Sequence, residues 1–225
     1  MATQSSPLAG MVQPSDLWGV YNNLRFLIRQ MLANVQTATI VTVVSCTNDG
    51  GVSPVGTVDV QILVNQITAQ GIQIPHATMY SLPYVRVQGG ANAVIIDPQP
   101  GDIGIAVFAS RDITNVKNTK AQASPGSFRT HSYSDGMYIG GLLNGTPSQY
   151  VQFEASGITI SSPTTITLNA PLVTINGALQ QTGGSVTISQ TLSVTGDVKA
   201  NGISLETHVH SGVSTGTSDT GGPVA

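Results

Sequence analysis

Residues 165–205 read TITLNAPLVTINGALQQTGGSVTISQTLSVTGDVKANGISL, and this run sets the architecture of the C-terminal part of the chain. It consists of short units in which apolar and small polar residues alternate, a pattern typical of β-strands. Gly, Asn or Pro separates each unit from the next, and the same texture begins near Tyr150. The sequence therefore predicts a stack of short strands over 150–205. The units are Gly157–Ile160, Thr165–Leu168, Leu172–Ile175, Ser185–Ile188, Thr191–Val194, Asp197–Ala200 and Ile203–Leu205.

One chain cannot close a core with these units, because each holds only two or three apolar residues. Three chains wound around a common axis can do so, and stacked short repeats bury a continuous core only through their neighbours. Charged residues make up 8% of the chain, against roughly 25% in ordinary soluble proteins. Like charges repeated around a symmetry axis would repel one another. The sequence thus predicts an intertwined trimeric β-helix as a shaft.

Two histidines, His208 and His210, follow the last unit. In an extended segment, positions i and i+2 project from the same face, so both imidazoles can point at one place. Two imidazoles are too few to hold a transition metal, whereas three chains would supply six, enough for an octahedral site. This spacing predicts a metal-binding tip over 206–225. The alternative is a flexible tail in which the histidine pair arose by chance.

The charge balance argues against nucleic acid as a partner. The net charge is −3 and the pI is about 5.7, whereas binding a phosphate backbone needs clustered Lys and Arg. The N-terminus shows no basic region followed by an apolar run, so we expect no secretory signal and assembly in a host cytoplasm. The single cysteine, Cys46, cannot form an intrachain disulfide and is expected to pack in a core.

The N-terminal half divides into three predicted parts. Apolar residues from Leu17 to Leu32 recur at helical spacing, which predicts a docking helix within 1–34. Residues 35–110 carry five or six strands in a length that suits a small OB-fold barrel, and 111–149 would be a connector. The class is therefore all-β with a short N-terminal helix. The predicted strands are Thr39–Ser45, Gly56–Val64, Thr78–Tyr80, Tyr84–Val87, Val94–Ile96 and Ile103–Ala109.

Three stretches of the chain stand out together: DPQPGDIGIAVFASRD at 97–112, HSYSDGMYIGG at 131–141, and the HVHSG that starts at His208 after the Thr-Ile-Thr repeats. They resemble the baseplate central spike proteins of contractile-tailed phages, a family that includes the spikes of R-type bacteriocins (pyocins). The resemblance covers nearly the whole chain, and the order of the regions carries more weight than any single motif. It implies a homotrimer with an OB-fold collar, a β-helical shaft and a pointed apex.

In that family, the tip histidines bind one iron ion per trimer on the three-fold axis, and Ca²⁺ and Cl⁻ can occupy axial sites nearby. The resemblance therefore implies that His208 and His210 are iron ligands, with Asp219 a conceivable contact for the other ions. It also implies a place in the virion, at the tip of the tail baseplate. The implied partners are the baseplate hub, the tail tube and, transiently, the host outer membrane that the spike pierces when the sheath contracts.

Two other functions compete with this interpretation. A cell-wall lysozyme domain would need well over a hundred residues between collar and shaft, and the interval from 111 to 149 is too short for one. The carboxylates that could be proposed as a catalytic pair are better explained as solvated or capping groups; they are Asp102, Asp135 and Glu154. We therefore expect that the protein is not an enzyme.

A peripheral tail fibre or a receptor-binding β-helical tip is the second competing function. Sugar binding would call for exposed aromatic residues along the shaft, and none follows Phe153.

Overall fold

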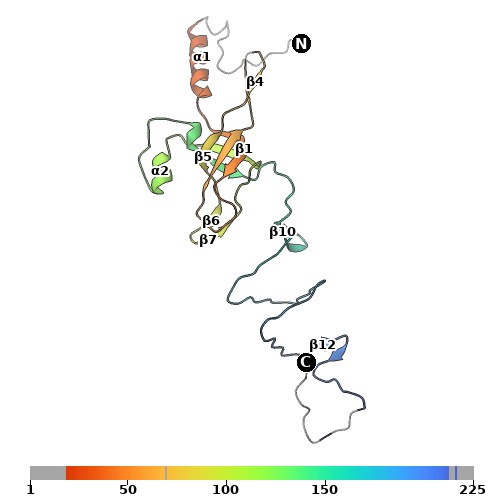
Figure 1. Ribbon diagram of the computed structural model, residues 1–225. Helices are drawn as coiled ribbons and strands as arrows, with labels where there is room; N and C mark the ends of the chain where they lie inside the picture. The colour runs from red at the N-terminus through yellow and green to blue at the C-terminus, as the bar shows by residue number, and fades with distance from the viewer. Residues whose placement is uncertain (1–18, 69, 213–215, 217–225) are drawn as a thin grey trace. The chain divides into compact units, whose positions relative to one another are not determined.

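The computed structural model describes residues 19–68, 70–212 and 216, and the chain divides into two compact units, 1–164 and 165–225 (Figure 1). It is mostly β, with a short N-terminal helix, as predicted. Within the described part, no helix has both the length and the apolar character needed to cross a bilayer.

The helix α1 spans Val20–Ala33 and follows Gly19, whose φ is 92°. None of its residues is buried, and most of its apolar side chains are exposed, including Leu24 at 55% and Met31 at 71%. This agrees with the predicted helix, although Leu17 lies outside the described residues. A second short helix, α2, spans Thr114–Thr119.

A five-stranded antiparallel sheet forms the centre of the first unit, in the order β5-β2-β1-β8-β9. Buried and less buried residues alternate along its strands, as period-two side-chain geometry requires. The register shifts between Val43 and Ser45 in β1 and between Val58 and Val60 in β2; such bulges bend and twist a strand. The strands are β1 Ala38–Cys46, β2 Thr57–Ile62, β5 Met79–Pro83, β8 Ile103–Phe108 and β9 Gly136–Gly140.

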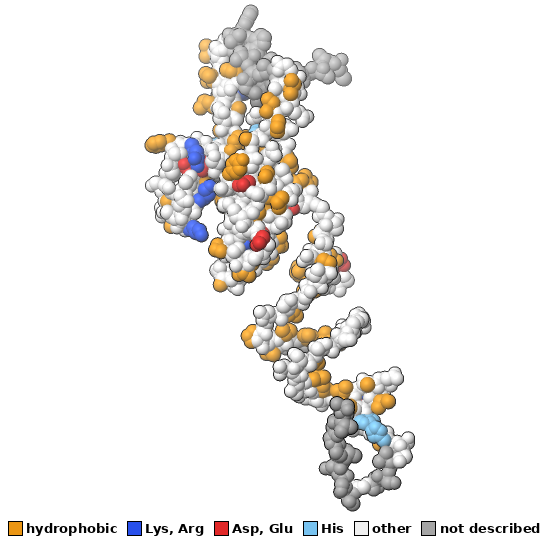
Figure 2. Space-filling view, viewed as in Figure 1, with side chains coloured by type: hydrophobic (Ala, Val, Ile, Leu, Met, Phe, Trp, Pro, Cys, Tyr) orange, Lys and Arg blue, Asp and Glu red, His pale blue; other side chains and the backbone are white. Residues whose placement is uncertain are grey.

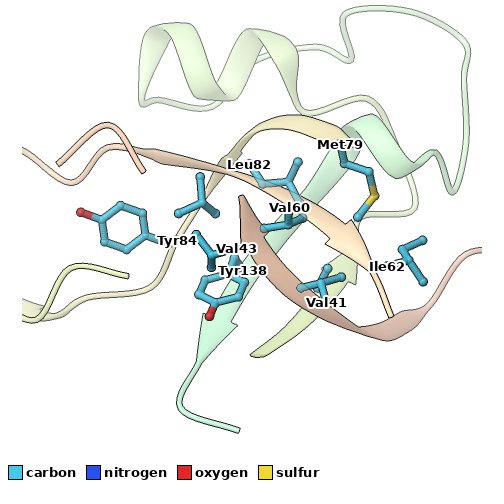
Figure 3. Packing of buried hydrophobic residues seen from close by; sticks show 10 residues of the cluster. Val41, Val43, Val60, Ile62, Met79, Leu82, Tyr84 and Tyr138 are labelled. Carbon is cyan, nitrogen blue, oxygen red and sulfur yellow. The ribbon is translucent and has the colours of Figure 1, made fainter. Parts of the chain in front are cut away.

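The sheet curls into a half-barrel around one apolar core (Figure 3). Its two edges approach each other where Tyr84, just after β5, forms an isolated bridge with Tyr138 of β9, and the Val85 amide donates to the Tyr138 carbonyl at 3.0 Å. Cys46 packs against this core, as predicted. The buried residues are Val41, Val43, Val58, Val60, Ile62, Met79, Leu82, Tyr84, Ala106 and Tyr138.

The strand predictions match the sheet only in part. Four of the six predicted strands overlap β1, β2, β5 and β8. The other two, 84–87 and 94–96, are largely wrong, because each shares a single residue, Val87 or Val94, with a separate hairpin of β6 Val87–Gly89 and β7 Asn92–Val94. The fifth strand of the sheet, β9, comes from the segment predicted as a connector. Three shorter elements complete the unit: the hairpin of β3 Gln66–Ile67 and β4 Gln73–Ile74, the 3-10 turn η2 Tyr133–Asp135, and the hairpin of β10 Tyr150–Glu154 and β11 Gly157–Ser161.

Most of the predicted shaft repeats, unlike the strands of the sheet, form no regular secondary structure in the single chain. Gly157–Ile160 lies in β11, and the last two units lie at the hairpin of β12 Lys199–Ala200 and β13 Ile203–Ser204. The described residues from 165 to 198 form no strand in the single chain, so the predicted strands are not present there. A lone chain offers these short units no neighbour to complete a hydrogen-bonded ladder. Their apolar side chains stay exposed (Figure 2), among them Ile166, Leu168, Leu172, Val173, Ile175, Leu179, Val186, Ile188, Leu192 and Val194.

Candidate metal centre

A tight hairpin positions the segment that carries the two histidines. β12 and β13 pair antiparallel, with Lys199 opposite Ser204 and Ala200 opposite Ile203. The two connecting residues, Asn201 and Gly202, have φ values of 51° and 82°. Positive φ at both central residues is the requirement of the type I′ hairpin turn, and Asn-Gly is its preferred sequence. The chain leaves this hairpin only a few residues before His208.

The imidazoles of His208 and His210 lie next to each other, with ring centroids 5.1 Å apart and ring planes at 81°. The intervening Val209 side chain is 91% exposed. The two residues that the sequence selected are thus neighbours in space as well as in order.

The hydrogen bonding of His208 suits a metal ligand. Its Nδ1 lies 3.1 Å from the carbonyl oxygen of Leu205, and that contact is a hydrogen bond when Nδ1 carries the proton. Metal-binding histidines commonly hold one ring nitrogen in this way, which fixes the tautomer and leaves the other nitrogen free as ligand. The donor set therefore fits an ion held through His208 Nε2.

One chain does not complete such a site. Across the described residues, no group of three or more His, Cys, Asp and Glu side chains lies together in a metal-binding arrangement. Asp219, the conceivable contact for further ions, lies outside the described residues. The other two histidines are elsewhere: the His76 ring packs against Tyr133 at 5.9 Å, and His131 Nδ1 lies 3.3 Å from the Gln36 carbonyl oxygen. Among the described residues, His208 and His210 therefore have no third metal-binding side chain beside them.

The sequence analysis did not predict a buried ion pair in the collar, which is the half-barrel formed by β5, β2, β1, β8 and β9 with the loops between these strands. Arg86 Nη2 and the phenol of Tyr84 both donate to Asp97 Oδ1, each at 2.5 Å, and the Gly50 amide donates to Asp97 Oδ2 at 3.0 Å. The Arg86 and Asp97 side chains are 2% and 0% exposed. Burial acts to raise the pKa of Asp97, but the hydrogen bonds from Tyr84 and Arg86 outweigh it and hold the pKa below its ordinary value.

This ion pair buries Arg86 and Tyr84, two residues that a nucleic-acid-binding surface would need to expose. Besides pairing with Asp97, Arg86 donates through Nη1 to the Ser53 carbonyl at 2.7 Å, and Tyr84 lies in the core. Of the aromatic and basic side chains on the predicted strands, only Tyr80 remains exposed, at 68%. Stacking platforms beside a basic groove are the usual features of single-strand binding, and these three residues do not form one.

A second charge cluster anchors the loop between β8 and β9. Arg129 donates to both oxygens of Asp135, through Nε at 2.7 Å and Nη2 at 2.9 Å, and also to Asp112 at 3.0 Å. The hydrogen bond from Arg129 holds the pKa of Asp135 below its ordinary value against the opposing effect of burial. Hydrogen bonds from Thr114 and Ser127 lower the pKa of Asp112 to about 2.

The carboxylates considered as catalytic candidates have separate partners. Asp135 is bound to Arg129, Asp102 accepts from the Gln99 amide at 2.8 Å, and Glu154 bonds with Gln152 and with Ser156. A general acid requires a raised pKa, whereas the pKa of Asp135 is lowered. Their roles in this structure are those of turn and ion-pair residues.

Acid should release the loop that Arg129 anchors. Both carboxyl groups have folded-state pKa values below their ordinary value, so their contribution to stability is complete above the ordinary pKa and is lost as the pH falls. The loss should run from about pH 5 down to about pH 2. Hydrogen exchange of residues 111–135, corrected for intrinsic rates, should quicken over this range, while Arg129→Met should exchange rapidly already at pH 6. Equal protection at both ends of the range would contradict the prediction.

Comparison with protein families gives two matches. Residues 42–141, which run from β1 to the end of the sheet, match the N-terminal domain of phage protein Gp138. Residues 202–224, which include both tip histidines, match the GpV apex motif, a motif associated with a metal-capped apex. No individual curated protein matches the chain. In their order along the chain, collar first and apex last, the two matches point to the family of phage baseplate central spike proteins.

Proposed function

We propose that the protein is the central spike of a contractile-tail baseplate and that it pierces the host outer membrane when the sheath contracts. The observation that carries the proposal is the match to the apex motif over the segment in which the rings of His208 and His210 lie side by side. This segment follows a run of repeats that leaves its apolar side chains exposed in one chain. A narrow assembly that ends in a closed tip is suited to piercing.

A homotrimer accounts for the exposed repeats. Between 165 and 205, apolar residues such as Leu172 at 79% and Leu179 at 77% remain largely exposed in the described part of the single chain. Burial of one such side chain contributes roughly 1.5–3 kcal/mol, and two further copies would supply the surface. In the proposed shaft, 150–205, the repeats between the β10–β11 and β12–β13 hairpins would pair between chains, so many contacts must break together before the trimer opens.

Iron is the proposed ion at the tip, one per trimer. His208 and His210 of three chains would hold it, and the ion would supply cross-linking of the three chain ends at the place where they would otherwise fray. Affinity alone favours nickel or copper over iron, so the choice of iron rests on the family resemblance and on availability. Ca²⁺ and Cl⁻ at neighbouring axial sites remain part of the proposal, without assigned residues.

The remaining parts have proposed roles in the same assembly. The curled sheet, whose edges meet at Tyr84 and Tyr138, supports an OB-fold collar built mainly from 35–110, to which the predicted connector 111–149 adds the strand β9. The exposed apolar face of α1 supports docking of 1–34 on the baseplate hub or tail tube. The separate partners of Asp102, Asp135 and Glu154 support a structural part rather than an enzyme. Assembly would take place in the host cytoplasm and the mature position would be the virion tail tip.

Imaging tests this function most directly. Cryo-electron microscopy of tails that carry a tagged copy should place the protein on the tail axis, below the hub, at the tip of the baseplate. Tails assembled without the protein should lack density there. A peripheral position, attached to the baseplate rim, would overturn the proposal and favour a receptor-binding fibre.

The purified full chain should be a trimer. Sedimentation equilibrium should give three times the chain mass of 23.2 kDa, because the repeats bury their apolar residues only against other copies. Replacing Leu172 and Leu179 together with Asp should shift the mass towards that of one chain, while the same change at Ile72, exposed on the β3–β4 hairpin, should leave it at three. A folded wild-type monomer would contradict the trimer.

A further inference from the structure

One carboxylate ahead of the tip hairpin holds the segment that follows it. Asp197 precedes β12, yet its Oδ1 accepts hydrogen bonds from the Ser204 hydroxyl at 2.9 Å and from the Glu206 amide at 3.3 Å. The Leu205 amide donates to the Val198 carbonyl at 2.8 Å in the same stretch. Asp197 thus ties the entry of the hairpin to its exit.

The bonds continue from this carboxylate to the histidine. Ser204 Oγ, which donates to Asp197, accepts from the Thr207 amide at 2.9 Å. The Leu205 carbonyl, held by its position between the bonded Ser204 and Glu206, lies 3.1 Å from His208 Nδ1. A short series of hydrogen bonds therefore links Asp197 to the ring that would bind the metal.

This series matters because apolar packing cannot orient the segment. Leu205 is 67% exposed and Val209 is 91% exposed, and His208 and His210 lie on the surface. The direction of the chain after β13 is therefore set by the tight turn and by these hydrogen bonds. Groups that orient metal ligands commonly change metal affinity by about 10- to 100-fold when they are removed.

We propose that Asp197 and Ser204 are positioning residues for the tip metal: they fix the backbone of 205–207 so that the Leu205 carbonyl holds His208 Nδ1 and presents Nε2 to the ion. This inference rests on the proposed metal site at His208 and His210 and adds to it residues outside the His-x-His pair. Asp197 also lies before residue 202, where the match to the apex motif begins.

The ion pair between Asp197 and Lys199 does not account for the position of the Asp197 side chain. Lys199 Nζ lies 4.0 Å from Asp197 Oδ2, and the Lys199 side chain is 65% exposed. An ion pair this exposed contributes little to stability. The hydrogen bonds to Ser204 and Glu206 use the other oxygen, Oδ1, so the two roles can be separated by mutation.

Four variants of the full-length protein test the proposal. Asp197→Ala and Ser204→Ala remove acceptors from the series, whereas Asp197→Asn keeps a carbonyl oxygen at the Oδ1 position and Lys199→Ala removes only the ion pair. Metal-free trimers are titrated with Ni²⁺ as the probe, because imidazole binds it well. In the same metal-free samples, hydrogen exchange follows the amides of Glu206 and Thr207, and ¹⁵N NMR reports which nitrogen of His208 is protonated.

Asp197→Ala and Ser204→Ala should weaken Ni²⁺ binding by about 10- to 100-fold, quicken exchange at Thr207, and shift the proton of His208 away from Nδ1. Asp197→Asn should restore most of the affinity, and Lys199→Ala should match the wild type. Unchanged affinity in Asp197→Ala overturns the positioning role, as does a loss in Lys199→Ala equal to that in Asp197→Ala. If the wild-type trimer does not bind Ni²⁺ at all, or if His208→Ala with His210→Ala binds it as well, the proposed metal site itself fails.

Discussion

Purified wild-type protein should contain one metal ion for every three chains, and replacing both His208 and His210 with Ala should reduce this to none. The expected ratio follows from two imidazoles per chain and six positions in an octahedral site. Zinc is a poorer fit to such a site, because it usually takes four ligands. Elemental analysis of the purified protein, with the metal identified in the same measurement, gives the ratio directly.

The double substitution should leave the trimer intact, because the repeats of 150–205 would still pair. Sedimentation of the variant should therefore give the mass of three chains. The matched control replaces His76 and His131, which lie in the collar and contact Tyr133 and the Gln36 carbonyl, and it should keep the metal. A ratio near one ion per chain, or metal that survives the tip substitution, would contradict a shared site.

Asp97→Ala should produce the largest loss of stability in the collar. The substitution leaves Arg86 charged and buried without its carboxylate, and its Nε already has no hydrogen-bond partner. It also deprives the Tyr84 hydroxyl and the Gly50 amide of their acceptor. Removing one member of a buried pair is far more harmful than replacing both members with apolar groups.

Native-state hydrogen exchange measures this effect in the intact protein. Amides in β1 and β8 should exchange about 100-fold faster in Asp97→Ala, as expected for the loss of one partner of a buried ion pair. The control is Asp49→Ala, since Asp49 is an exposed aspartate in the loop between β1 and β2, next to the Gly50 whose amide donates to Asp97. Replacing Arg86 with Met together with Asp97→Ala should recover part of the loss. Equal exchange in Asp97→Ala and the control would show that the pair does not support the collar.

The alternation of residues was enough to predict four of the five strands in the central sheet. Period two identified β1, β2, β5 and β8 within a few residues of their ends, because which face a strand buries depends only on successive side chains. The spacing of His208 and His210 likewise selected two neighbouring rings. The Asn201-Gly202 pair is a further signal of this local kind, and it would have marked the tip hairpin.

Pairing over long separations could only be found in the folded chain. β9 joins β8 from a segment without strong alternation, and Gly104 accommodates it because a Cβ there would lie 2.4 Å from the Ile139 carbonyl oxygen. In the repeats of 165–198 the reverse holds. Their alternating pattern is typical of strands, but they form none, because the single chain provides no neighbouring strand to pair with them.

Which charged groups form ion pairs also depended on the tertiary structure, because the partners lie far apart in the sequence. Arg86 meets Asp97 and Arg129 meets Asp112 only after the sheet has formed around them, and nothing in their spacing distinguishes them from solvated side chains. In the sequence, Asp197 is the first residue of the predicted unit Asp197–Ala200, and only the hairpin brings it beside Ser204. Residue type and spacing determine which face a strand presents and which side chains can bind a metal. Which distant groups become partners is decided by the path of the backbone, since a hydrogen bond requires its two atoms to lie within about 3 Å.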